Sequence, residues 1–122
     1  MQGKVTNLVG IKQRVRVMPR EPDIQAIFQR RLRSARERRE LSQKQLGILA
    51  GLDPFVASTR VNRYELGVHK PDLATVNRLA DVLGVPTAYF FADDDRLARM
   101  ILAFNQLPAS QKDDLLKKIE PQ

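Results

Sequence analysis

A chain of 122 residues, 43% of them hydrophobic, supports one compact domain with short appendages. It has no cysteine and a single histidine, His69, which excludes a disulfide framework, a thiol nucleophile and a zinc site built from cysteines or several histidines. No apolar run approaches the roughly 18–20 residues that span a bilayer, and the N-terminus lacks the apolar core of a secretory signal. We therefore expect a cytoplasmic protein with no membrane association.

The net charge of +7 is concentrated at the start of the chain. Residues 1–40 carry 11 Lys and Arg against 4 Asp and Glu, whereas residues 41–122 carry 10 of each, so the whole excess lies in the first third. Such asymmetry favours attraction to a polyanion, either a nucleic acid or a membrane surface. A solvated helix face rich in arginine explains the same composition.

Residues 1–22 are predicted to form a basic N-terminal arm. The stretch from Ile11 to Val17 alternates apolar and basic side chains well enough for a short strand, although an isolated strand is only marginally stable. In a mobile arm, Arg14, Arg16 and Arg20 could reach into a minor groove of DNA. A disordered tail, or a strand that pairs with a partner subunit, fits the same residues.

Helical periodicity begins near residue 23. A first helix at residues 23–39 has one apolar face made of Ile27, Phe28, Leu32 and Ala35. Its arginines are expected mostly on other faces, where some should neutralise phosphate: Arg30, Arg31, Arg33, Arg38 and Arg39. Ser42 and Gln45 then form a capping box for a short second helix, which carries Leu46, Leu49 and Ala50 inward and ends near Gly51.

The start of the third helix has two interpretations. Asp53 and Pro54 resemble an N-cap followed by proline at the first helical position, which predicts a helix over residues 54–66. Alternatively, residues 53–57 form a separate turn before the helix. In both cases Ala57, Val61 and Tyr64 form the buried stripe, and Gly67 ends the helix.

Further start and stop signals predict helices to the end of the chain, so the fold class is all-α. Asp72 caps a fourth helix that ends at Gly84, with Leu73, Val76, Leu79, Ala80 and Leu83 on its inner face. Thr87 opens a short fifth helix, and two amphipathic helices follow Asp93 and Pro108. The predicted organisation is an arm at 1–22, a DNA-binding domain at 23–92, and a helical extension at 93–122 that is a possible dimerisation element.

The short helices within residues 42–67, joined by tight turns, match the requirements of a helix-turn-helix. This motif needs a bracing helix and a second helix that lies in the major groove. If Ala57, Val61 and Tyr64 face inward, Thr59 and Asn62 face outward, with Ser58 and Arg63 at the flanks. These four side chains can hydrogen-bond to base edges, although a solvated face of an ordinary bundle has the same pattern.

The sequence resembles the phage-repressor/Cro (Xre-type) helix-turn-helix domain over about residues 24–91. The runs that carry the resemblance are RERRELSQKQL at 36–46, AG at 50–51, VNRYELG at 61–67, PDL at 71–73 and LADVLGV at 79–85. Together they fix residue types in four consecutive helices. The resemblance implies a five-helix bundle like that of lambda repressor and a transcriptional regulator that binds double-stranded DNA, expected to act as a repressor.

The resemblance also implies roles for individual residues. Bases are read at Ser58, Thr59 and Arg63, to which the helical wheel adds Asn62. Phosphates are bound by Gln43, Arg60, His69 and Lys70, and we add the neighbouring Lys44 to this predicted set. Arg36 and Glu65, which interrupt otherwise apolar faces, form a structural ion pair, as a buried charge requires.

The chain departs from the family pattern between Gly51 and Glu65, where it holds roughly one extra helical turn of residues. If the helix begins at Pro54, Phe55 points toward DNA and could touch a thymine methyl. If residues 53–57 form a separate turn, Phe55 is buried and base reading starts at Ser58. The sequence favours this second arrangement.

The expected partners are a palindromic operator and a second copy of the chain. A homodimer through Phe90, Phe91 or residues 93–122 would match half-sites about 34 Å apart. The alternative is an antitoxin or adaptor whose domain mainly binds a protein partner, through residues 93–122. No Gly-rich phosphate loop, catalytic triad or metal-ligand cluster is apparent, so we expect no enzyme, cofactor or metal.

Overall fold

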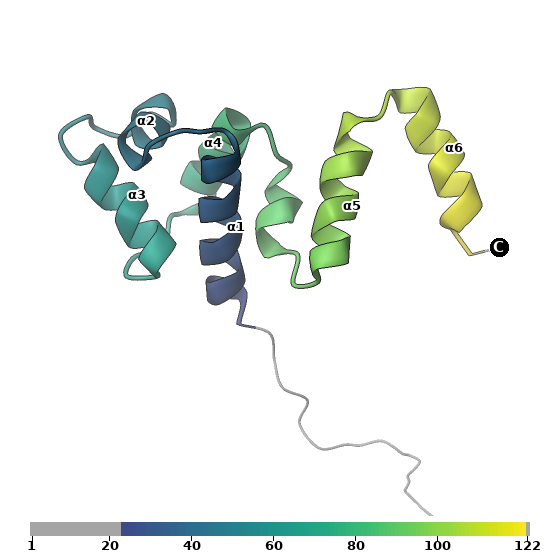
Figure 1. Cartoon of the computed structure of the whole chain (residues 1–122), viewed down its shortest axis with the longest axis horizontal. Helices are drawn as coiled ribbons and strands as arrows, with labels where there is room; N and C mark the ends of the chain where they lie inside the picture. The colour runs from purple at the N-terminus through teal and green to yellow at the C-terminus, as the bar shows by residue number, and fades with distance from the viewer. Residues whose placement is uncertain (1–22, 122) are drawn as a thin grey trace, which may run out of the picture.

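The computed structural model describes residues 23–121, which fold into six α-helices and one short 3₁₀ helix (Figure 1). In chain order these are α1 (Ile24–Arg38), α2 (Gln43–Leu49), α3 (Ala57–Leu66), α4 (Leu73–Leu83), η1 (Thr87–Phe91), α5 (Asp95–Gln106) and α6 (Ala109–Ile119). These residues contain no strand, which confirms the all-α class. None of the described helices has the length and apolar character needed to cross a bilayer. The predicted basic arm lies outside the described residues.

Side-chain caps fix the starts of α1, α2 and α4 where the sequence predicts them. Ser42 Oγ accepts a hydrogen bond from the Gln45 backbone N–H at 3.0 Å, and the Gln45 side chain accepts one from the Ser42 N–H at 2.8 Å. Asp23 and Asp72 cap α1 and α4, each accepting from the N–H three residues further on. Each cap satisfies a backbone donor that has no partner within its helix.

The start of α3 differs from the cap expected at Asp53 and Pro54. The helix begins at Ala57, and its N-cap residue Val56 makes no side-chain hydrogen bond. Asp53 instead closes a turn: its Oδ1 accepts from the Phe55 N–H at 2.9 Å, and its carbonyl accepts from the Val56 N–H at 3.0 Å. Of the two interpretations of this segment, the helix from residue 54 is therefore wrong, and the separate turn before the helix is the one that the structure contains. An aspartate before proline suits either an N-cap or an Asx turn, and the local pattern does not distinguish them.

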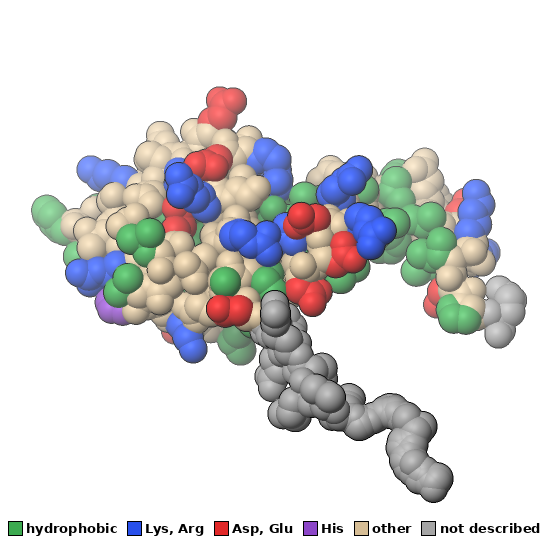
Figure 2. All heavy atoms as spheres, turned by 60° about the horizontal axis from the view of Figure 1, so that its bottom comes forward, with side chains coloured by type: hydrophobic (Ala, Val, Ile, Leu, Met, Phe, Trp, Pro, Cys, Tyr) green, Lys and Arg blue, Asp and Glu red, His purple; other side chains and the backbone are tan. Residues whose placement is uncertain are grey.

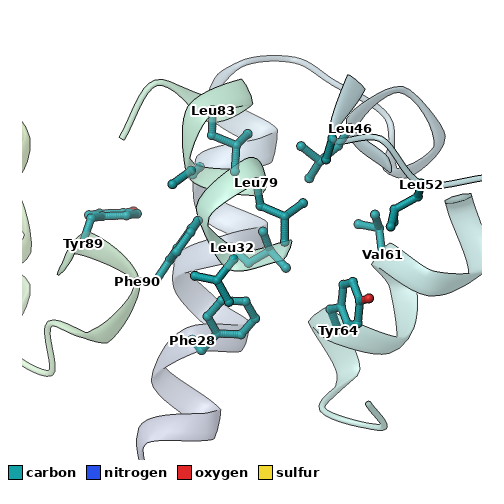
Figure 3. Packing of buried hydrophobic residues seen from close by; sticks show 14 of the residues in the cluster. Phe28, Leu32, Leu46, Leu52, Val61, Tyr64, Leu79, Leu83, Tyr89 and Phe90 are labelled. Atoms are coloured by element: carbon teal, nitrogen blue, oxygen red, sulfur yellow. The ribbon is translucent and has the colours of Figure 1, made fainter. Parts of the chain in front are cut away.

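The core lies between α1, α4 and η1 and extends to α2 and α3 (Figure 3). Phe28 and Leu32 of α1 lie beside Leu79 of α4 and Phe90 of η1 in Figure 3. The rings of Phe28 and Phe90 meet edge to face, with centroids 5.2 Å apart. On the α3 side of the cluster, Val61 is fully buried. This packing holds one face of α3 against the bundle and leaves its other face to solvent.

The two helices of the motif, α2 and α3, approach each other closely at Gly47. A Cβ added to Gly47 would lie 2.7 Å from Ala57 Cβ and 3.0 Å from the Ala57 carbonyl oxygen, which leaves no space for a side chain. The far end of α2 is tied to α4, because Arg78 Nε donates to the Ala50 carbonyl at 2.9 Å. Contacts in the second half of α2 and at its C-cap therefore fix its position.

Three side chains lie elsewhere than the helical periodicity predicts. Leu73 is 81% exposed and Leu49 is also exposed, because they occupy the first residue of α4 and the last residue of α2. Arg31 is buried: its Nε and Nη2 both donate to the Ala92 carbonyl, at 3.1 and 2.7 Å, and Nη2 lies 3.0 Å from Asp95 Oδ1. A buried guanidinium needs such partners, so Arg31 is not among the arginines of α1 that face a phosphate.

The last two helices differ in how they meet the bundle. Ala98 of α5 belongs to the buried core cluster, whereas α6 has no buried residue. Figure 1 shows α6 at the end of the molecule opposite α3. Large apolar side chains of both helices are exposed, namely Leu97, Met100, Leu116 and Ile119. Figure 2 shows hydrophobic side chains gathered over this end of the molecule. The α5–α6 pair thus presents an apolar surface that the rest of residues 23–121 leaves exposed.

Candidate nucleic-acid interface

Helix α3 divides into a buried face and an exposed polar face. Ala57, Val61, Tyr64 and Glu65 are buried, as their three- and four-residue spacing requires. The side chains of Ser58, Thr59, Asn62 and Arg63 are all exposed. The structure therefore brings the four predicted base-reading residues together on one solvent-facing helix surface.

The residues predicted to bind phosphate surround this surface. Lys44 on α2, Arg60 on α3, and His69 and Lys70 in the loop after α3 are exposed, and Gln43 at the start of α2 is half-buried. Figure 2 shows the histidine beside a basic side chain at the end of the molecule opposite α6. Cationic and polar groups from both helices of the motif and the following loop thus lie on one end of the bundle.

Arg36 and Glu65 form an ion pair that joins α1 to α3. Arg36 Nε donates to Glu65 Oε2 at 2.6 Å, and Nη2 donates to Oε1 at 3.1 Å. The remaining terminal nitrogen, Nη1, donates to the Leu41 carbonyl at 2.9 Å. The hydrogen bonds that Arg36 donates to Glu65 raise the pKa of Arg36 above its usual value, so the guanidinium stays charged. Each charge of the pair is satisfied, as its burial demands.

Gln43 extends this pair to the exposed face of α3. Its Nε2 donates to Glu65 Oε1 at 3.1 Å and to Asn62 Oδ1 at 3.0 Å. A continuous set of hydrogen bonds therefore runs from the Arg36 guanidinium through Glu65 and Gln43 to Asn62. No pattern in the sequence indicates this connection, because its partners are 19 and 22 residues apart and no periodic signal relates them.

Arg60 is held against its own helix. Its Nη2 donates to the Tyr64 hydroxyl at 2.8 Å, and its guanidinium lies 5.9 Å from the centre of the Tyr64 ring. The i,i+4 spacing allows this contact. Arg60 is therefore oriented along α3, while the rest of its exposed guanidinium can accept an anionic partner.

The arginines of α1 are mostly engaged within the protein. Arg33 pairs with Glu37 at 3.2 Å, and Arg39 Nη1 donates to the Leu83 carbonyl at 3.1 Å. Arg38 lies over the Tyr89 ring at 5.6 Å. Arg39 and Arg38 thus support the contacts of α1 with α4 and η1, which the charge count alone does not reveal.

The fold and this surface can be compared with known proteins. A family described as a helix-turn-helix domain matches residues 27–89, just over half of the chain. The chain belongs to the phage-repressor/Cro-type helix-turn-helix regulators. This confirms the resemblance noted in the sequence. The matched region of this helix-turn-helix regulator begins in α1 and ends in η1, so α5 and α6 lie beyond it.

Two relatives support the same assignment. The chain is 31% identical to the cryptic phage CTXphi transcriptional repressor RstR of Vibrio cholerae over 101 residues, which cover 77% of this chain and 86% of that protein. It is 46% identical to the crystal structure of the transcriptional regulator BswR, with a TM-score of 0.71 over 75% of this chain and 91% of the other. Both similarities cover more of this regulator than the family domain does.

Proposed function

We propose that this regulator is a sequence-specific repressor that binds double-stranded DNA with α3 in the major groove. The observation that carries this proposal is the exposed polar face of α3, bordered by exposed basic residues of α2 and of the loop after α3. A helix-turn-helix uses its second helix in this way. Repression is the activity named for the relative RstR, which supports the same role here.

Base reading is assigned to the exposed side chains of α3. Arg63 suits guanine, because a guanidinium donates to both O6 and N7. Ser58 and Thr59 can donate to or accept from base edges. The Asn62 carbonyl oxygen already accepts from Gln43, so its amide N–H groups are the part left to reach a base or a phosphate.

Phosphate binding is assigned to Gln43, Lys44, Arg60, His69 and Lys70. They are half-buried or exposed at the edge of the reading face. Such contacts fix the position of the protein on the duplex without reading sequence, and each cation that neutralises a phosphate adds to the salt dependence of binding. The arm arginines Arg14, Arg16 and Arg20 lie outside the described residues, and a minor-groove role for them stays a prediction.

We further propose that the chain works as a homodimer on a palindromic operator. The domain at residues 23–92 would bind one half-site, and residues 93–122 would provide the subunit interface. The exposed apolar side chains of α5 and α6 support this arrangement, since they lie at the end opposite α3. Two α3 helices must be held roughly 34 Å apart to read successive major grooves on one side of DNA.

Selection of bound sequences from a random duplex pool tests the proposal. The full chain should enrich a two-fold symmetric motif, and Thr59→Ala and Arg63→Ala should each relax preference at particular positions of that motif. Arg33→Ala is the matched control, because it removes an exposed arginine of α1 whose partner is Glu37. Failure of the wild-type chain to enrich any sequence would contradict the proposal.

A second candidate function is that of an antitoxin or adaptor that mainly binds a protein. The observation that favours it is the same apolar α5–α6 surface, which a heterologous partner could cover instead of a second copy. Purification of the chain from its native cells distinguishes the two. A stable heteromeric complex that is lost on deletion of residues 93–122 supports the adaptor, whereas a homodimer alone supports the repressor.

A further inference from the structure

Phe55 is the most exposed large apolar side chain among residues 23–121, with 97% of its surface accessible. It lies in the turn between α2 and α3, one residue before the N-cap of α3. The sequence favoured a buried Phe55 in this turn, and that expectation is wrong. The turn is present, but its aromatic ring extends into solvent.

The turn that carries Phe55 is anchored at both ends. Leu52 before it and Ala57 after it are buried, and the Leu52 N–H donates to the Gly47 carbonyl at 2.9 Å. Within the turn, Asp53 accepts from the N–H groups of Phe55 and Val56. The backbone under the ring is thus fixed before any partner binds, so little conformational entropy is lost there on binding.

The surroundings of Phe55 favour a nucleic acid over an apolar protein surface. Apart from Leu66 at the far end of the helix, the exposed side chains that follow it on α3 are polar or cationic: Ser58, Thr59, Arg60, Asn62 and Arg63. The nearest acid in sequence, Asp53, already accepts the hydrogen bonds of the turn. An exposed apolar ring at the N-terminal end of a largely polar and basic helix face, with the partly exposed Val56 beside it in the turn, matches a partner that is mainly anionic but carries apolar groups.

We propose that Phe55 is a specificity-determining residue that contacts the C5-methyl group of a thymine in the major groove. This inference rests on the proposed function, because it requires α3 to enter that groove. The thymine methyl is the apolar group that base pairs present there. Phe55 precedes α3, so the contact falls at the end of the half-site that meets the N-terminus of the helix. Burying one methyl changes affinity about fourfold.

The first experiment compares the sequences that wild type and Phe55→Ala select from a random duplex pool. Wild type should prefer thymine at one position of each half-site, and Phe55→Ala should lose that preference while keeping the rest of the motif. Phe55→Leu should keep part of it, because leucine can also contact the methyl. Leu73→Ala is the matched control, since Leu73 is 81% exposed but lies on α4, and it should leave the motif unchanged.

The second experiment uses the selected operator with that thymine replaced by deoxyuridine, which removes the methyl alone. Wild type should bind the altered operator about fourfold more weakly, whereas Phe55→Ala should bind both operators equally. The slope of log K against log salt should not differ between the two proteins, because no charge is removed.

Two results would overturn the assignment of Phe55 while leaving the proposed function intact. One is an unchanged motif and affinity for Phe55→Ala. The other is an unchanged motif together with an altered oligomeric state in Phe55→Ala, which would make Phe55 a protein contact. Absence of any enriched motif with wild type would overturn both proposals, because a residue cannot set a specificity that the protein lacks.

Discussion

Arg36 and Glu65 hold α1 and α3 together through two hydrogen bonds, Nε to Oε2 at 2.6 Å and Nη2 to Oε1 at 3.1 Å. Their side chains are only 13% and 4% exposed. We expect Glu65→Ala to lower the free energy of unfolding by about 3 kcal/mol, because it leaves a buried guanidinium without its carboxylate. Urea denaturation measures the loss of stability. Under conditions where Glu65→Ala is still folded, its base preference should stay close to that of wild type.

Glu37→Ala is the matched control, since Glu37 pairs with Arg33 at the surface and its loss should cost about 0.5 kcal/mol or less. The double variant Arg36→Met/Glu65→Leu tests the cause, because apolar residues of similar size remove both charges together. It should recover much of the lost stability. A melting temperature unaffected by Glu65→Ala would contradict the structural role of the pair.

Gly47→Ala should destabilise the fold although alanine is the better helix former. The new methyl would lie 2.7 Å from Ala57 Cβ and so force α2 and α3 apart. Overpacking of this kind costs about 1–3 kcal/mol, against a propensity gain of up to about 1 kcal/mol. Thermal unfolding measures the change in stability of Gly47→Ala. Lys44→Ala, an exposed substitution on the same helix, is the control. A melting temperature of Gly47→Ala above that of wild type would show that α2 and α3 have room for the added methyl group.

The cap of α4 predicts a pH dependence of stability. Asp72 accepts from the Thr75 N–H at 2.8 Å, and hydrogen bonding to Thr75 lowers the pKa of Asp72 below its usual value. A carboxyl group whose pKa is lowered by folding stabilises the folded state at pH values above its unfolded-state pKa. This contribution is lost as the pH falls through the folded-state pKa. The stability difference between wild type and Asp72→Ala should therefore be full at neutral pH and shrink below about pH 3.9.

Asp81→Ala, an exposed acid on the same helix, is the comparison for this experiment. Urea unfolding of the three proteins over a pH series provides the curves. A difference between wild type and Asp72→Ala that stays constant down to the lowest pH would argue against the carboxylate cap.

Salt dependence tests the assignment of phosphate contacts. Lys44→Ala and Lys70→Ala should each weaken binding to all duplexes and reduce the slope of log K against log salt by about 0.9 per bound protomer. Fluorescence anisotropy with a labelled operator and an unrelated duplex gives both quantities. Arg33→Ala should keep the wild-type slope, because its guanidinium pairs with Glu37. A loss confined to one sequence would indicate base reading instead.

If the chain forms the proposed homodimer, the apolar surface of α5 and α6 predicts how that dimer can be broken. The double variant Met100→Glu/Ile119→Glu should raise the dimer dissociation constant at least about tenfold, because an unpaired charge in an apolar interface costs more than about 1.4 kcal/mol. Sedimentation velocity measures the change, and Asp114→Ala on the exposed part of α6 is its control. A variant that stays dimeric would place the interface elsewhere.

Much of the fold could be predicted because its signals are local. The capping box of Ser42 and Gln45 and the buried stripe of α3 involve residues three or four apart, where a helix brings side chains together. Predictions failed where contacts with residues distant in the sequence determine whether a side chain is buried. Arg31 is buried because it donates to the Ala92 carbonyl and pairs with Asp95, and no periodicity within α1 indicates these contacts.

The candidate site likewise contains some residues whose positions could be predicted from the sequence and others whose positions could not. The outward direction of Thr59 and Arg63 follows from the inward direction of Val61 and Tyr64, so a helical wheel finds it. The exposure of Phe55 does not follow from any wheel, because the residue lies in a turn whose direction is set by the burial of residues on either side. Hydrophobicity alone favours burial, and the tertiary structure overrides it here.

The hydrogen bonds from Arg36 to Asn62 have a consequence for how this regulator could acquire new target sites. Asn62 shares Gln43 with the buried ion pair, so a substitution there disturbs a donor on which Glu65 also depends. Ser58, Thr59 and Arg63 are exposed and stand outside that set of hydrogen bonds. If these three side chains read bases as proposed, single substitutions there would change binding preference without loss of folding, which separates this part of α3 from its structural part.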